Sequence, residues 1–101
     1  MRRQLVLQFP HASLADYDAM ILLEDRIDEA LGDLGELDGH DAGSGEMNIF
    51  FYTPEPKAAF AVIAALPVMA PLMASLKAAY RDVDDRYVVL HPAGSTDFDI
   101  A

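Results

Sequence analysis

A glycine-rich segment followed by an aromatic run, "DGHDAGSGEMNIFFYT", occupies residues 38–53 in the middle of the chain. A three-residue loop over residues 43–45 would place Leu37, Ile49 and Phe51 on one face of a β-hairpin, where helices could cover them. Glycine suits the left-handed position that such a loop requires. The segment therefore predicts a hairpin with strands at about 36–40 and 46–52.

The same segment does not fit a ligand loop. A phosphate loop opens a helix, whose N-terminus supplies the favourable field, whereas "GSG" precedes a strand and adjoins the acidic Glu46. Asp38, Asp41 and Glu46 also lack the alternating ligand spacing of a calcium-binding EF-hand loop. We interpret the segment as a turn.

The sequence on either side of the hairpin alternates between strand and helix patterns. An alternating run over Arg3–Phe9 predicts a strand ended by Pro10. "SLAD" predicts a helix start, with Ser13 as N-cap and Asp16 at the third helical position. That helix carries an apolar stripe of Met20, Leu23, Ile27, Ala30 and Leu31, and it ends at Gly32 or Gly35.

The second half repeats this alternation. Thr53, Pro54 and Glu55 predict the start of a second helix, which runs to about Leu66. A short helix from about Pro71 to Tyr80 and a last strand over Arg86–Leu90, ended by Pro92, complete the order.

The order strand, helix, strand, strand, helix, strand predicts an α+β, ferredoxin-like βαββαβ fold. Right-handed crossovers give a four-stranded antiparallel sheet in the order 4-1-3-2, with the helices on one face and a short extra helix before the last strand. A length of 101 residues suits one domain, which we expect over residues 1–92. Residues 93–101 lack periodicity and predict a flexible C-terminal tail.

Charge and composition narrow the classes of partner. Seventeen acidic against seven basic residues give a net charge of −10, which argues against nucleic acids and anionic membranes as partners. The nineteen uncharged residues 58–76 contain Pro67 and Pro71, which would interrupt a transmembrane helix. The N-terminal apolar run is too short and broken for a signal peptide. We therefore expect a cytoplasmic protein.

The sequence provides no metal or cofactor site and no catalytic triad. Cysteine is absent, which excludes thiolate chemistry. His40 and His91 fall on the two outer strands of the predicted sheet, about 14 Å apart at about 4.8 Å per strand, and His11 falls at the other end. The three histidines therefore cannot share one ion within a monomer.

The sheet face that the helices leave open is unexpectedly apolar. An uncovered antiparallel face is usually polar, and although aromatic side chains favour strands in any case, apolar patches with tyrosines and a polar rim are typical of interfaces. We therefore predict an acidic interaction module that self-associates, as a homodimer, or binds a protein through this face. The predicted partner- or ligand-binding residues are Val6, Gln8, Asn48, Phe50, Tyr52, Tyr87, Val89 and His91.

Two other functions remain open. In an enzyme of the dimeric α/β-barrel kind, a small molecule would occupy a cleft, and His91, Asn48 or Tyr52 would act as acid–base or orienting groups. An acidic antitoxin or immunity-type protein would instead use the net negative charge against a basic partner.

The segments "DGHDAGSGEMNIFFYTPEP" and "LKAAYRDVDDRYVVLHP" together resemble a family of small, uncharacterised bacterial proteins of about this length with a ferredoxin-like fold. The resemblance spans most of the chain and implies the hairpin and a final strand after Arg81. It implies no activity, because ferredoxin-like domains serve regulatory, RNA-binding, enzymatic and nuclease functions.

Overall fold

The computed structural model describes residues 2–10, 17–43, 45–82, 84–92, 94 and 98. The predicted helix start at Ser13 lies outside these residues, as does most of the predicted flexible tail. In chain order the elements are β1 (Arg3–Pro10), α1 (Tyr17–Leu31), the 3₁₀ turn η2 (Gly32–Leu34), β2 (Glu36–Gly43), β3 (Glu46–Thr53), α2 (Pro56–Ala64), the 3₁₀ helix η3 (Pro67–Leu72), β4 (Lys77–Arg81) and β5 (Tyr87–His91).

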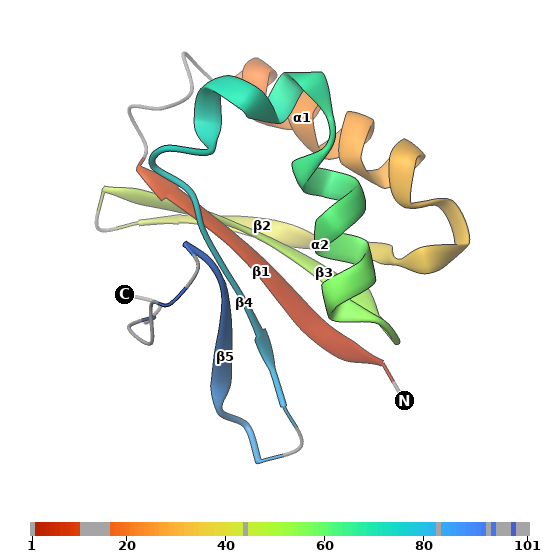
Figure 1. The fold of residues 1–101 in the computed structure, drawn as a ribbon. Coiled ribbons are helices and arrows are strands. Elements are labelled where there is room, and N and C mark those ends of the chain that lie inside the picture. The colour runs from red at the N-terminus through yellow and green to blue at the C-terminus, as the bar shows by residue number, and fades with distance from the viewer. Residues whose placement is uncertain are drawn as a thin grey trace.

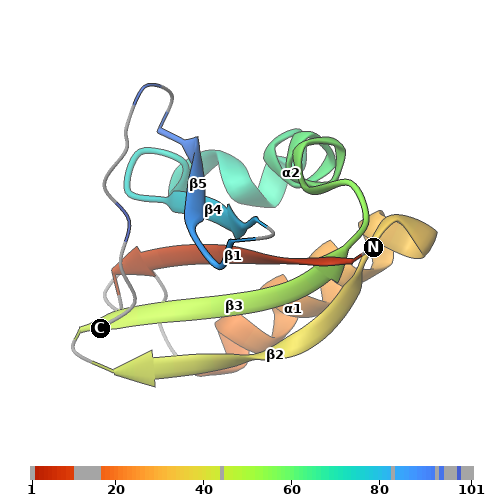
Figure 2. The same cartoon turned by 90° about the horizontal axis from the view of Figure 1, so that it is seen from below.

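The five strands form one antiparallel sheet in the order β2-β3-β1-β4-β5. Both helices cover the same face of this sheet (Figure 1), and the view from below shows α1 behind the strands (Figure 2). The predicted order 4-1-3-2 is confirmed as β4-β1-β3-β2, and β5 is an additional strand beside β4. The fold is therefore ferredoxin-like with one added edge strand.

The core lies between the helices and the sheet. The apolar stripe of α1 is buried as predicted, except that Ala30 is exposed. Thr53 ends β3 and connects it to α2: its hydroxyl donates to the carbonyl of Leu34 (2.6 Å) and accepts from the amide of Glu55 (3.0 Å). The largest side chains in the core are Phe9, Phe51, Leu5, Leu7, Met20, Ile27, Ile49, Ile63, Met69 and Leu76.

The helix predicted over Pro71–Tyr80 is wrong. Pro71 lies in η3, and Lys77–Arg81 form β4, the fourth strand of the ferredoxin-like core. The predicted last strand is instead the fifth strand, at the edge of the sheet. Ala78 and Ala79 favour a helix by intrinsic propensity, but both are fully buried between β1 and β5, and this tertiary packing overrides the propensity.

The central hairpin is confirmed, but its register differs from the prediction. Leu37 pairs with Phe51 as expected, and then a β-bulge at Asp38 shifts the remaining pairs by one residue. Gly43 therefore pairs with Glu46, and the connection has two residues rather than three. Gly45 has a positive φ of 80°, which glycine adopts without strain. The shift turns His40 toward the helices instead of the open face.

None of the helices in the described part of the chain has the length and apolar character needed to cross a bilayer. The uncharged segment that raised this question is divided between α2, η3 and the turn that leads into β4.

Candidate functional site: the open sheet face

The sheet face turned away from the helices, called here the open face, consists of three rows of side chains that run across the strands. The central Val6 row is apolar, because Val6 pairs with Phe50 on one side and with Ala79 on the other, and Ala79 pairs with Val89. On one side lies the Gln8 row, which contains Asp41, Asn48, Gln8 and Lys77. On the other side lies the Tyr52 row, which contains Glu36, Tyr52, Gln4, Arg81 and Tyr87.

Burial differs strongly along these rows. Val6 and Ala79 are fully buried, and so are Gln8 and Asn48, which are joined by a hydrogen bond from Nε2 of Gln8 to Oδ1 of Asn48 (3.0 Å). The apolar side chains that remain accessible belong to β5 and β3: Phe50, Tyr87 and Val89 are half-buried, and Tyr52 is 36% exposed. The accessible apolar part of the open face is therefore aromatic and β-branched, and the exposed charged residues Glu36, Asp41, Lys77 and Arg81 border it.

His91 does not belong to the open face. The register between β4 and β5 shifts between Ala78 and Ala79, so that one additional residue of β5, Leu90, is accommodated in a bulge. Beyond this bulge the imidazole of His91 lies on the helix side, with its ring centroid 5.9 Å from that of Phe60 and its Nε2 2.9 Å from the carbonyl oxygen of Met73. The predicted position of His91 is wrong because the prediction assumed uninterrupted alternation.

The other seven predicted residues do lie on the open face, in the rows given above. The groups considered for acid–base chemistry, however, are separated. Asn48 lies in the Gln8 row and is held by Gln8, Tyr52 lies two rows away, and His91 is on the opposite face.

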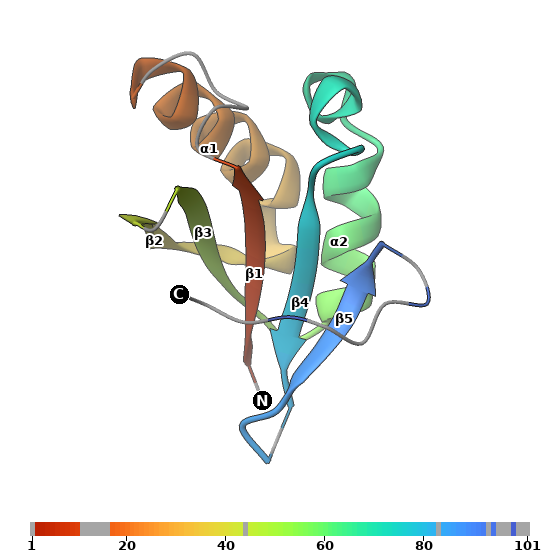
Figure 3. The ribbon, with the colours of Figure 1, turned by 90° about the vertical axis from the view of Figure 1, so that its left-hand side faces the viewer.

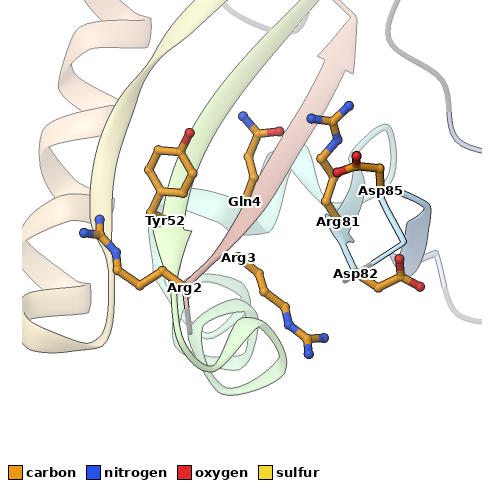
Figure 4. A pocket seen from close by; sticks show the side chains of 7 residues that line it. All are labelled: Arg2, Arg3, Gln4, Tyr52, Arg81, Asp82 and Asp85. Atoms are coloured by element: carbon orange, nitrogen blue, oxygen red, sulfur yellow. The ribbon is translucent and has the colours of Figure 1, made fainter.

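A cleft of about 220 Å³ adjoins the end of the Tyr52 row. The side chains of Tyr52, Gln4 and Arg81 point to the same side, out of the open face (Figure 4). Arg81 lies over the ring of Tyr87 (5.5 Å from the guanidinium carbon to the ring centroid), and Arg2 lies over Tyr52 (5.4 Å). The residues that line the cleft are Arg2, Arg3, Gln4, Tyr52, Arg81, Asp82 and Asp85.

Basic and acidic side chains are mixed around this cleft, because its lining contains three arginines and two aspartates. Arg2 forms an ion pair with Glu36. Asp82 is committed to the β4–β5 turn, where its Oδ1 accepts the amides of Asp84 (2.9 Å) and Arg86 (3.1 Å). The predicted site omits Arg81 because Arg81 follows a segment that is predicted to be helical.

A second feature that the sequence did not reveal lies between α1 and β2. Glu24 is only 3% exposed, and its Oε1 lies 2.9 Å from Nδ1 of His40. The two atoms are at ion-pair distance, although within the described residues Oε1 accepts no hydrogen bond of good geometry. The shift at Asp38 creates this contact, because it turns His40 toward α1. No group of three potential metal ligands occurs among the described residues.

One residue near the C-terminus contacts the open face. The ring of Phe98 packs against that of Tyr87, with centroids 4.9 Å apart and an interplanar angle of 54°. Aromatic pairs of this tilted kind are favourable beyond the area that they bury.

Models of known protein families, curated proteins and solved structures provide no match to this chain.

Proposed function

We propose that this protein is a small, non-enzymatic interaction module that associates with a second copy of itself through the open face. The observation that carries the proposal is the set of accessible apolar side chains Phe50, Tyr52, Tyr87 and Val89, which is bordered by exposed charged residues. An apolar centre with a polar rim is the usual composition of a protein interface. Phe50 and Tyr52 would supply accessible aromatic area at low entropic cost.

The size of the face corresponds to that of a small interface. At about 4.8 Å between strands and about 3.3 Å per residue, the open face measures roughly 20 by 25 Å, or roughly 500 Å² in projection. Specific interfaces bury about 800 Å² per partner, and weak ones bury less. We therefore propose association in the micromolar range. We also propose that the protein is cytoplasmic and that it belongs with the small bacterial proteins that its sequence resembles.

The experiment is the mass in solution at micromolar concentration, measured by light scattering on the wild-type protein and on Phe50→Asp. A buried aspartate would carry an unpaired charge into the interface, so this variant should lose the face-to-face association. Leu22→Asp is the matched control, because Leu22 is 54% exposed on the outer side of α1. Tyr52→Arg tests the same face at an exposed position, should Phe50→Asp be unstable. A mass that Phe50→Asp and Tyr52→Arg leave unchanged would contradict the proposal.

A further inference from the structure

The two edges of the sheet differ in how they are protected against pairing with another strand. β2, at one edge, carries Glu36, Asp38 and Asp41 and is interrupted by a bulge. Charges and bulges of this kind prevent edge-to-edge association. β5, at the other edge, has the sequence YVVLH, without a charged residue, and its bulge lies only at the Leu90 end. β5 lies at the edge of the sheet beside β4 (Figure 3), and its residues Tyr87–Val89 are uncharged and pair with β4 without a bulge.

The backbone groups that face outward on β5 follow from the alternation of an antiparallel ladder. The amide of Asp82 donates to the carbonyl of Arg86 (2.9 Å), so this pair is a hydrogen-bonded pair. Because hydrogen-bonded and non-hydrogen-bonded pairs alternate, the pair Arg81–Tyr87 is non-hydrogen-bonded, Tyr80–Val88 is hydrogen-bonded, and Ala79–Val89 is again non-hydrogen-bonded. The N–H and C=O groups of Tyr87 and Val89 thus point away from β4.

We propose that this edge pairs with β5 of a second copy of the chain, antiparallel and centred on Val88. In this register Tyr87 of each copy lies opposite Val89 of the other, and their outward N–H and C=O groups form four hydrogen bonds. Registers centred on Tyr87 or on Val89 would form only two, because only one residue of each copy would then meet an outward-facing partner. The register centred on Val88 is therefore the one in which all the outward-facing backbone groups of Tyr87 and Val89 form hydrogen bonds.

The side chains are compatible with this register. Tyr87 beside Val89 of the other copy is an aromatic–β-branched pair, a favourable combination across strands. The two Val88 side chains meet on the helix side, where Val88 already packs against the core. Asp85 falls opposite His91 of the other copy and Arg86 opposite Leu90, so no like charges face each other. The described residues beyond β5, which are Pro92, Gly94 and Phe98, form no backbone hydrogen bond with it.

The edge pairing is independent of the face-to-face association, and the two are geometrically compatible. Pairing through β5 joins two sheets side by side and leaves β2, with its acidic residues, at both outer edges. The assembly therefore closes at two copies along the sheet. With the open faces also in contact, the complete assembly would contain four copies.

The test uses Val89→Pro with Val89→Ala as its matched control. Proline removes the outward N–H of Val89 without removing a bond to β4, a position at which edge strands tolerate proline. Alanine shortens the same side chain but keeps the N–H. We expect Val89→Pro to halve the mass measured for Val89→Ala by light scattering. Equal masses for folded Val89→Pro and Val89→Ala would overturn the inference.

A second measurement does not depend on a substitution. Amide hydrogen exchange of Tyr87 and Val89 in the wild-type protein should slow as the concentration rises, because these amides become hydrogen-bonded only in the assembly. Exchange of these two amides that is independent of concentration, while the mass rises, would overturn the edge pairing.

Combining the variants separates the two proposals. If both are correct, the wild-type protein reaches four copies, Phe50→Asp and Val89→Pro each leave two, and the double variant is a monomer. A mass that falls from Val89→Ala to Val89→Pro but does not fall with Phe50→Asp supports the edge pairing and contradicts the open-face proposal. The reverse result overturns the edge pairing alone.

Discussion

At the residue scale, the hydrogen bond between Gln8 and Asn48 is the most buried polar contact of the open face. Gln8→Leu removes the donor and leaves a buried amide with one partner fewer, so it should lower the free energy of unfolding by about 1–3 kcal/mol. Gln4→Leu, the same change in the half-buried Tyr52 row, should cost less. Urea denaturation measures both. A double variant, Gln8→Leu with Asn48→Leu, should cost less than the sum of its single changes, and strict additivity would contradict a direct coupling.

The contact between Glu24 and His40 leads to a second prediction at this scale. His40→Leu leaves the buried carboxylate of Glu24 without its ion-pair partner and should lower the free energy of unfolding by about 1–3 kcal/mol. Glu24→Gln removes the buried charge and keeps the shape of the side chain, and it should cost less. Thermal unfolding of both variants, with the exposed Glu29→Gln as control, provides the measurement. The opposite ranking would show that His40 does not compensate Glu24.

At the scale of elements, the turn between β4 and β5 contains a residue in a strained conformation. Asp85 has a φ of 60°, the left-handed region that glycine adopts more readily than aspartate. Asp85→Gly should therefore raise the free energy of unfolding by about 0.5 kcal/mol, after the larger entropy of glycine in the unfolded chain is subtracted. Asp84→Gly, in the same turn but without a positive φ, should be destabilising. Chemical denaturation measures the free energy of unfolding of both variants. Stabilisation by Asp85→Gly alone would indicate local strain at Asp85, whereas stabilisation by both would indicate a general effect of removing a negative charge.

The sequence predicted the elements that have a local residue pattern. It missed the features that depend on packing against other strands. The hairpin, the buried stripe of α1 and the order of β1, β3 and β2 follow from periodicity and from glycine and proline positions. β4 was missed because its alanines favour a helix in isolation. Two bulges account for the remaining differences: one brings His40 to Glu24, and the other moves His91 off the open face. A bulge adds one residue to a strand, and no periodic sequence pattern marks its position.

At the scale of the whole molecule, charge and shape have opposite effects on association. The Val6 row and the β5 edge favour contact between copies, whereas a net charge of −10 on each copy opposes it. The exposed acidic residues on the outer side of α1 lie away from both proposed interfaces, so their repulsion acts mainly over distance. Repulsion of this kind is weakened by salt, whereas hydrogen bonds and apolar contacts between strands are not.

Self-association should therefore strengthen as the salt concentration rises. Between 0.01 M and 0.1 M ionic strength the screening length falls from about 30 Å to about 10 Å, which is shorter than the width of the protein. We expect the dissociation constant, measured by analytical ultracentrifugation, to fall several-fold over this range. Asp28→Lys, on the outer side of α1, should tighten association at 0.01 M and have little effect at 0.1 M. Association that weakens with salt would instead indicate contacts between opposite charges, as expected if the acidic surface were itself the binding surface for a basic partner.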